Sequence, residues 1–134
     1  MESISYPIKP IGYIRHRHKD VPRHWSLSEL EGEIVIDEDY ALGIHDIKAG
    51  NLIVVLFLFD RAVSFTMDRL IVKPPHCDEY RGVFSTCSPV RPNPIGLSIV
   101  EVLEVHDFTI KVKRIDMFDG TPVLDIKPYI PYMS

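Results

Sequence analysis

The sequence has few cysteines, no excess of positive charge and no long apolar run, and each of these shortages excludes a class of protein. Its two cysteines, Cys77 and Cys87, are too few for the disulfide framework of a small secreted domain. The opening residues, MESISYPIKP, lack the apolar core and small-residue cleavage site of a secretory signal peptide. The longest apolar run, Leu52 to Phe59, has eight residues, whereas a membrane-spanning helix needs about 20. We therefore expect a cytoplasmic protein that does not span a membrane.

Long helices are not expected either, because eleven prolines are spread through the 134 residues. The length and the 46% content of hydrophobic residues suit one compact domain over residues 1–134. Short helical turns are predicted over 26–30 and 41–47. Short strands, which together indicate a single-domain, all-β barrel or sandwich, are predicted over 8–15, 33–36, 52–59, 70–73, 82–86, 97–105, 108–115 and 123–126.

Two neighbouring segments indicate a hairpin with an irregularity. Apolar and polar residues alternate over 108–112, and His106 and Asp107 form a connection short enough to join this strand to 97–105. The apolar parity of the 97–105 strand shifts after Val102, which predicts a β-bulge of the kind that curves a sheet toward closure.

The run over 52–59 lacks the polar alternation of a half-exposed strand. We expect both of its faces to be buried, as in a central strand or a strand that lies under a second subunit. A homodimer is therefore predicted.

Positive and negative charge are separated along the first part of the chain. The net charge of −4 argues against a protein that coats nucleic acid through bulk positive charge. Within 9–23, however, five basic residues accompany one acidic residue, and six acidic residues follow within 29–39. Two interpretations are open: both stretches are solvated faces, or Arg15, Arg17 and Lys19 belong to a local patch that binds RNA phosphates.

The segment 81–98, RGVFSTCSPVRPNPIGLS, combines rigidity with polar groups. Pro89, Pro92 and Pro94 each fix a φ angle and remove a backbone donor. Hydroxyl, guanidinium and amide groups surround them, and such groups fix polar ligands against a rigid backbone. The segment is either a small-molecule site or a connection shaped to cross the end of a barrel. Cys87 within it is expected to be a partly buried small residue rather than a nucleophile.

A second polar cluster lies near the end of the chain and consists of Asp116, Asp119, Gly120, Thr121 and Pro122. The pair Asp119-Gly120 is a turn signal that leads into the last predicted strand. In that strand Asp125 and Lys127 should share one face with Val123. They form either a surface ion pair or a pair of site residues.

Histidines near the start of the chain raise the question of a metal site. His16, His18 and His24, together with the pair His76-Cys77, do not have the spacing of a defined zinc site. We expect no bound metal.

Two motifs, in this order, resemble the signature of the TsaA-like (TrmO-type) tRNA methyltransferases. The first is GVF at 82–84 followed by Ser88-Pro89 and by RPNPIGLS at 91–98. The second is DGTPVLDIKPY at 119–129. Weaker matches at 10–15 and 21–23 extend the resemblance over nearly the whole chain.

The resemblance implies a mainly antiparallel, usually dimeric β-barrel that binds S-adenosylmethionine. The implied reaction is methylation of N6 of threonylcarbamoyladenosine beside the anticodon of tRNA, which makes the anticodon loop a partner. Asp125 would act as the base or orient the acceptor, with Lys127 and Tyr129 near the nucleobase or phosphate. Carried over by position, the cofactor would be held by Pro22, Arg23, His24, Phe59, Asp60, Cys87, Ser88, Arg91, Asn93, Ile95, Leu97, Asp119, Gly120 and Thr121.

Three of these positions depart from the pattern of the family. His24, Asp60 and Cys87 stand where Gln, His and Arg are common. The change at Cys87 replaces a charged group with several donors by a small weak donor, so weaker cofactor binding is expected. The alternative function is a catalytically divergent barrel that binds a nucleoside-like ligand or RNA without methyl transfer.

Overall fold

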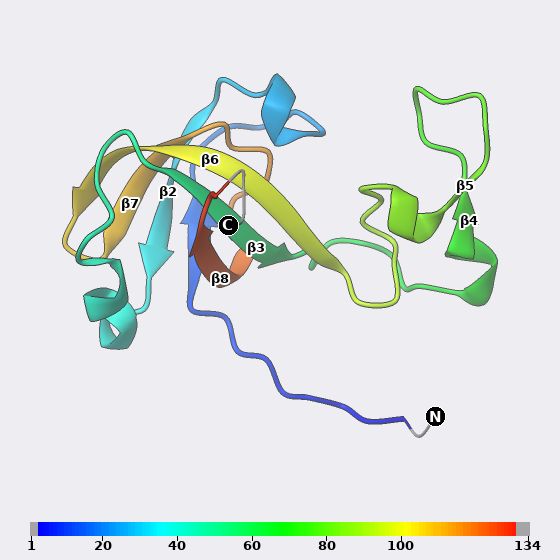
Figure 1. Ribbon diagram of the computed structural model, residues 1–134, viewed down its shortest axis with the longest axis horizontal. Helices are drawn as coiled ribbons and strands as arrows, with labels where there is room; N and C mark the ends of the chain where they lie inside the picture. The colour runs from blue at the N-terminus through cyan, green and yellow to red at the C-terminus, as the bar shows by residue number, and fades with distance from the viewer. Residues whose placement is uncertain (1–2, 131–134) are drawn as a thin grey trace. The chain divides into compact units, whose positions relative to one another are not determined.

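The computed structural model describes residues 3–130 and divides the chain into two compact units. The barrel unit contains Met1–Phe57 and Leu97–Ser134, and the loop unit contains Leu58–Gly96. Figure 1 follows the strands from the amino terminus in blue to the carboxyl terminus in red. The single domain over residues 1–134 stays a prediction.

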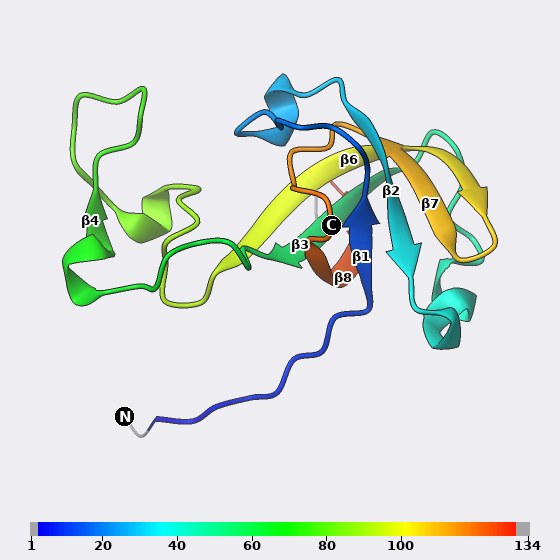
Figure 2. The same cartoon turned by 180° about the vertical axis from the view of Figure 1, so that it is seen from behind.

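Six antiparallel strands close into a barrel in the order β1-β2-β7-β6-β3-β8, and β1 pairs with β8 to complete the ring. The all-β prediction is confirmed. Figure 2 shows β1 beside β2 from behind. The strands are β1 Gly12–Arg15, β2 Glu31–Ile36, β3 Leu52–Leu58, β6 Ile95–His106, β7 Thr109–Lys113 and β8 Pro122–Pro128.

The barrel interior is filled by β-branched residues from alternate strand positions, as the pleat of a strand requires. Close approach of β1 to β2 also requires a glycine, because a Cβ on Gly12 would lie 2.2 Å from the carbonyl oxygen of Val35. The fully buried apolar residues are Ile14, Ile34, Val55, Val100, Val102, Ile110, Val112, Ile115 and Val123.

The predicted irregularity in the hairpin strand is confirmed. Val112 and Lys111 are adjacent on β7, but their partners on β6, Val102 and Glu104, are two residues apart. The extra residue on β6 is a β-bulge. The turn of this hairpin was predicted one residue too early. It contains Asp107 and Phe108, and Asp107 has a φ of 54°. Aspartate tolerates this left-handed conformation, which a two-residue hairpin turn requires.

The predicted start of the first strand was wrong, whereas the expectation that both faces of the 52–59 run are covered, by the barrel or by a second subunit, stays a prediction. The first strand begins at Gly12 rather than Ile8, because Pro10 cannot donate to a ladder. In β3 burial alternates: Ile53, Val55 and Phe57 are buried. The intervening residues are only half-buried or, at Leu52, 37% exposed. The sequence showed no alternation because the outward positions are also apolar.

The loop unit contains a two-stranded sheet of β4 Ile71–Val72 and β5 Arg81–Gly82. The strand predicted over 82–86 is instead mostly a 3-10 turn, because the backbone N–H and hydroxyl of Thr86 both donate to the carbonyl of Val83. Within residues 3–130 no helix has the length and apolarity to cross a bilayer. The 3-10 helices are η1 Trp25–Leu27, η2 Glu38–Ile44, η3 Met67–Leu70 and η4 Val83–Ser85.

Candidate functional site

Three segments of the barrel unit, far apart in sequence, meet around the carboxyl group of Asp116. This residue follows β7, and its Oδ1 accepts a hydrogen bond of 2.5 Å from the hydroxyl of Ser98. Ser98 is fully buried on β6. The backbone N–H of Trp25 donates to the same carboxyl group, which also lies within the electrostatic reach of His24. Asp116 therefore ties the 22–25 segment and the start of β6 to the 116–121 segment.

Burial raises the pKa of the Asp116 carboxyl above its ordinary value. The hydrogen bond from Ser98, the nearby His24 and the backbone donors oppose this shift because they stabilise the ionised form. The net result is a partly desolvated carboxyl group with several fixed donors. A group of this kind attracts a cation more strongly than an exposed carboxylate does, because little water screens it.

The imidazole of His24 is oriented by the start of η1. Its Nδ1 accepts a 3.2 Å hydrogen bond from the backbone N–H of Ser26, and the hydroxyl of Ser26 lies 2.6 Å from the same nitrogen. In the neutral ring the proton is therefore on Nε2. The ring also lies 5.0 Å from that of Trp25, centroid to centroid. His24 thus presents a donor with a fixed ring orientation beside Asp116.

The Asp119-Gly120 turn is fastened to the first strand. Gly120 has a φ of 85°, which favours glycine, and its N–H donates to the carbonyl of Ile14 at 2.7 Å. The N–H of Ile14 donates in turn to the carbonyl of Thr121 at 2.9 Å. Oδ1 of Asp119 accepts from the backbone N–H of His16 at 2.9 Å. The turn is consequently rigid, as a preorganised binding turn requires.

His16 is a structural residue rather than a metal ligand. It is 9% exposed; its Nδ1 accepts from the N–H of His18 at 3.0 Å, and its Nε2 donates to the carbonyl of Met117 at 2.7 Å. Both ring nitrogens are thereby used. Across residues 3–130, no three or more His, Cys, Asp and Glu side chains are grouped in a way that would hold a metal ion.

The predicted cofactor residues fall in both units. Pro22, Arg23, His24, Leu97, Asp119, Gly120 and Thr121 belong to the barrel unit, and Phe59, Asp60, Cys87, Ser88, Arg91, Asn93 and Ile95 to the loop unit. In the barrel unit, the segments that carry His24, Leu97 and Asp119 are those that converge on Asp116. Their roles toward a cofactor stay predictions.

Two residues at this convergence, Asp116 and Ser98, were missed as site residues. Each belongs to a segment already singled out: Asp116 begins the second polar cluster, and Ser98 ends the RPNPIGLS motif. Their hydrogen bond joins the start of β6 to the segment after β7, where the register of the hairpin beyond its bulge places residue 98 opposite residue 116. A short polar residue within a buried strand was the available signal, because such residues are usually hydrogen-bonded.

In the loop unit, the proline segment is held by its own polar groups. Nη1 of Arg91 donates to the carbonyls of Thr86 at 3.0 Å and Ser88 at 3.1 Å. The hydroxyl of Ser88 accepts from the N–H of Val90 at 3.3 Å. The rigidity inferred from the prolines is thus reinforced by hydrogen bonds. Cys87 is exposed, which corrects the expectation of partial burial, because the neighbouring backbone turns around the Arg91 guanidinium.

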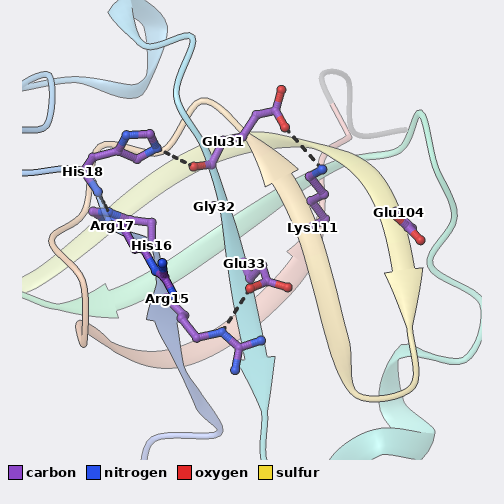
Figure 3. Close-up of a pocket in the computed structure, with 9 residues that line it drawn as sticks. All are labelled: Arg15, His16, Arg17, His18, Glu31, Gly32, Glu33, Glu104 and Lys111. Atoms are coloured by element: carbon purple, nitrogen blue, oxygen red, sulfur yellow. Dashed lines mark hydrogen bonds and ion pairs between the residues drawn. The ribbon is translucent and has the colours of Figure 1, made fainter.

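The basic stretch does not form a uniformly positive face. Arg15 is the cross-strand partner of Glu33, and their side chains form an ion pair of 3.0 Å. Figure 3 shows this pair beside a second one, Lys111 with Glu31 at 3.5 Å, in a pocket of about 480 Å³ that Arg17 also lines. The antiparallel pairing of β1 with β2 therefore brings the basic and acidic stretches side by side.

Asp125 and Lys127 form an ion pair of 3.1 Å on β8, with side chains that are 48% and 62% exposed. Their expected common face with Val123 was wrong. Leu56 and Phe57 are adjacent on β3, but their partners on β8, Asp125 and Val123, are two residues apart. The extra residue on β8 forms a bulge, and this bulge turns Val123 inward. Asp125 and Lys127 lie on the outer face, and the N–H of Tyr129 donates to the carbonyl of Leu52 at 3.2 Å. Their catalytic roles stay predictions.

Comparison with known proteins supports the sequence resemblance. The family model described as the tRNA-methyltransferase O N-terminal domain matches residues 14–134. An S-adenosyl-L-methionine-binding protein of Archaeoglobus fulgidus is 46% identical over 127 residues, which cover 92% of this chain and 89% of that protein. The tRNA (adenine(37)-N6)-methyltransferase of Escherichia coli is 36% identical over 140 residues, which cover 96% of this chain and 59% of the enzyme.

Solved structures show the same fold. A crystal structure of TrmO is 33% identical with a TM-score of 0.76, and the match covers 96% of this chain and 59% of that one. TrmO of a Pseudomonas species is 31% identical with a TM-score of 0.75, covering 98% of this chain and 57% of that one. The chain therefore spans somewhat more than half the length of these enzymes.

Proposed function

Because the chain belongs to the family of the tRNA-methyltransferase O N-terminal domain, we propose that it is an S-adenosylmethionine-dependent methyltransferase that modifies N6 of an adenosine in tRNA. The specific substrate proposed is threonylcarbamoyladenosine beside the anticodon. The observation that carries the proposal is the convergence on Asp116 of the three barrel segments that hold His24, Leu97 and Asp119. The relative from Escherichia coli, a tRNA (adenine(37)-N6)-methyltransferase, supports N6 of an adenosine in tRNA as the acceptor.

The groups around Asp116 fit a cationic cofactor. S-adenosylmethionine supplies a methyl group on a positively charged sulfur atom, and the partly desolvated carboxyl of Asp116 favours a positive charge nearby. His24 offers a donor of fixed orientation, and the turn at Asp119 offers a rigid backbone. Such preorganisation matters because methyl transfer depends mainly on alignment of the reacting atoms.

The chain's own residues must also position the acceptor and remove a proton from it. A carbonyl group flanks the target nitrogen of threonylcarbamoyladenosine, which makes its proton more acidic than that of adenine, so a modest base is sufficient. We assign Asp125 to this role or to orienting the acceptor. Its ion pair with Lys127 would orient the carboxylate and place a cation near the nucleobase or phosphate.

Calorimetric titration with S-adenosylmethionine, followed by methyl transfer from the labelled cofactor to tRNA with or without the threonylcarbamoyl group, tests the proposal. We expect binding, and transfer only to the threonylcarbamoylated tRNA. Cys87→Arg, which restores the common family residue, should tighten binding. Absence of cofactor binding by both proteins would contradict the proposal.

The second candidate function is a barrel that binds a nucleoside-like ligand or RNA without methyl transfer. Asp60 and Cys87 favour it, because they replace residues common in the family. Binding of S-adenosylmethionine and tRNA without any transferred label would identify this function.

We also propose that the chain forms a homodimer. Leu52, Val54, Leu56 and Leu58 make the outward face of β3 apolar, although they are only partly buried within one chain. A second copy would cover this face, because a contiguous apolar face on a strand is a frequent interaction surface. Leu56→Lys places a cation opposite Asp125, its cross-strand partner, so the monomer should tolerate it. Sedimentation should then show a monomer, whereas an unchanged dimer would place the interface elsewhere.

A further inference from the structure

Phe84 is a large aromatic residue held at the surface of the loop unit. Its side chain is 73% exposed, whereas its neighbour Val83, in the same 3-10 turn, is 1% exposed. The turn is thus anchored by Val83 and fixed by the two hydrogen bonds from Thr86 to the Val83 carbonyl. A single exposed apolar residue is common, so exposure by itself indicates nothing further.

A cation is fixed beside the Phe84 ring. The guanidinium carbon of Arg91 lies 6.0 Å from the ring centroid, at the outer limit of a cation–π contact. The guanidinium cannot swing away freely, because Nη1 donates to the carbonyls of Thr86 and Ser88. Pro89 and Pro92 restrict the backbone that carries it. Phe84 and Arg91 therefore form a preorganised pair of one aromatic ring and one planar cation.

The charge of the loop unit suits an anionic partner better than that of the barrel unit. Its residues, 58–96, contain five Arg or Lys and four Asp or Glu, a net charge of +1. The whole chain has a net charge of −4, so the remaining residues together carry a net charge of −5. A polyanion is thus repelled less by the loop unit than by the barrel unit.

We propose that the Phe84–Arg91 pair is a stacking site for an unpaired nucleobase of RNA. Single-stranded bases stack on exposed aromatic rings and on guanidinium planes, and cationic side chains hold the adjoining phosphates. The exposed ring of Phe84 has no role in the small-molecule site predicted in the same segment, whereas Arg91 is also one of the predicted cofactor residues. The inference deepens the proposed function, on which it rests for the choice of RNA, by naming where an extruded base is held.

The test compares RNA with and without a base to stack. Binding of the full chain to a synthetic anticodon stem-loop is measured by fluorescence anisotropy, along with the same RNA carrying abasic nucleotides in the loop. Phe84→Ala should weaken binding to the intact loop at least about fivefold, and should leave binding to the abasic loop unchanged. Phe84→Trp should retain the affinity for the intact loop, because it keeps a ring on which a base can stack.

A matched control is Tyr40→Ala. Tyr40 is also an exposed aromatic residue, at 46%, but it follows Asp37, Glu38 and Asp39. We expect no change in RNA binding, because the neighbouring carboxylates repel phosphates. An equal loss for both variants would contradict the proposal.

Other uses of Phe84 give different results, each of which would overturn the inference. Equal losses of Phe84→Ala on intact and abasic RNA would show that the ring does not stack on a base. A change in sedimentation would assign Phe84 to contact between copies, and a matching loss of S-adenosylmethionine affinity would assign it to the cofactor. The protein could fail to transfer a methyl group while Phe84→Ala still weakens binding to the intact loop and not to the abasic loop. That result would contradict only the proposed function.

Discussion

The two units of the chain are stabilised in different ways. The barrel unit has a core of β-branched side chains at 0% exposure on strands that close into a ring. In the loop unit, Val83 is the one apolar side chain among residues 58–96 that is buried, whereas Val63, Met67, Ile71, Tyr80 and Phe84 are all more than half exposed. The loop unit instead depends on prolines and on hydrogen bonds such as those of Arg91.

This difference indicates that the two units contribute differently to the stability of the chain and to binding. Burial of apolar area supplies most of the free energy of folding, so the barrel unit should determine the global stability. Local hydrogen bonds and prolines reduce the freedom of a loop without requiring a large core. The loop unit can therefore present rigid polar and aromatic groups while contributing little to the global free energy of unfolding.

The largest effect is expected in the barrel core. Ile110→Ala should lower the free energy of unfolding by about 2–5 kcal/mol, because Ile110 is fully buried on β7. Urea denaturation measures the loss. Lys111→Ala, on the outward side of the same strand, is the control and should change stability by less than about 1 kcal/mol. Similar losses for the two variants would contradict a core-dominated barrel.

Val83→Ala tests the same idea in the loop unit. Removal of two methyl groups should cost about 1–2 kcal/mol of local stability, since Val83 is the unit's buried apolar anchor. Hydrogen exchange should accelerate within 58–96, while the global urea midpoint stays close to that of the wild type. A lowered midpoint, together with faster exchange in the barrel strands, would show that the units unfold as one.

Asp116→Asn tests the electrostatic part of the barrel site. The Asn oxygen can still accept from Ser98, so the main change is the loss of negative charge. Affinity for S-adenosylmethionine should fall about tenfold, with a smaller loss for S-adenosylhomocysteine, whose sulfur is uncharged. Asp107→Asn, at the hairpin turn, serves as the control. Equal losses of affinity for both ligands would show that the charge of Asp116 does not act on the sulfur and that the residue has a structural role.

The charges of the barrel surface should not contribute equally to tRNA binding. Arg15 is paired with Glu33, so the neutral double variant Arg15→Met with Glu33→Gln should bind tRNA as the wild type does. Arg17→Ala should flatten the slope of log affinity against log salt by about 0.7–0.9 per lost phosphate contact. A salt series on both variants measures this. Equal slopes in all three proteins would place the tRNA elsewhere.

The smallest effect concerns pH. Because burial raises the pKa of Asp116, the folded state favours the neutral carboxyl more than the unfolded state does. The resulting stabilisation is complete below the ordinary carboxyl pKa and is lost as pH rises through the raised value. Asp116→Asn has no such loss, so its stability relative to the wild type should increase as pH rises through this window. A difference that stays constant with pH would contradict the burial of the charge.

Sequence by itself determined the local features of the barrel. Alternation located the strand after the hairpin turn, and the parity shift after Val102 located the bulge, because both depend on side-chain order along one strand. The motifs at 91–98 and 119–129 identified the family, since their residues are contiguous. The sequence did not show which face of β3 points into the barrel, because a strand buried on both faces and one with an apolar outward face have the same sequence pattern.

Tertiary structure alone decided which distant residues meet. Arg15 and Glu33 are far apart in the chain, and only the antiparallel register makes them an ion pair. The bulge in β8 separates Val123 from Asp125, although residues two apart normally share a face. Ser98 and Asp116 lie opposite each other across the β6–β7 hairpin, but only the bulge after Val102 brings them into that register. Contacts of this kind depend on strand order and register, which composition and local spacing do not specify.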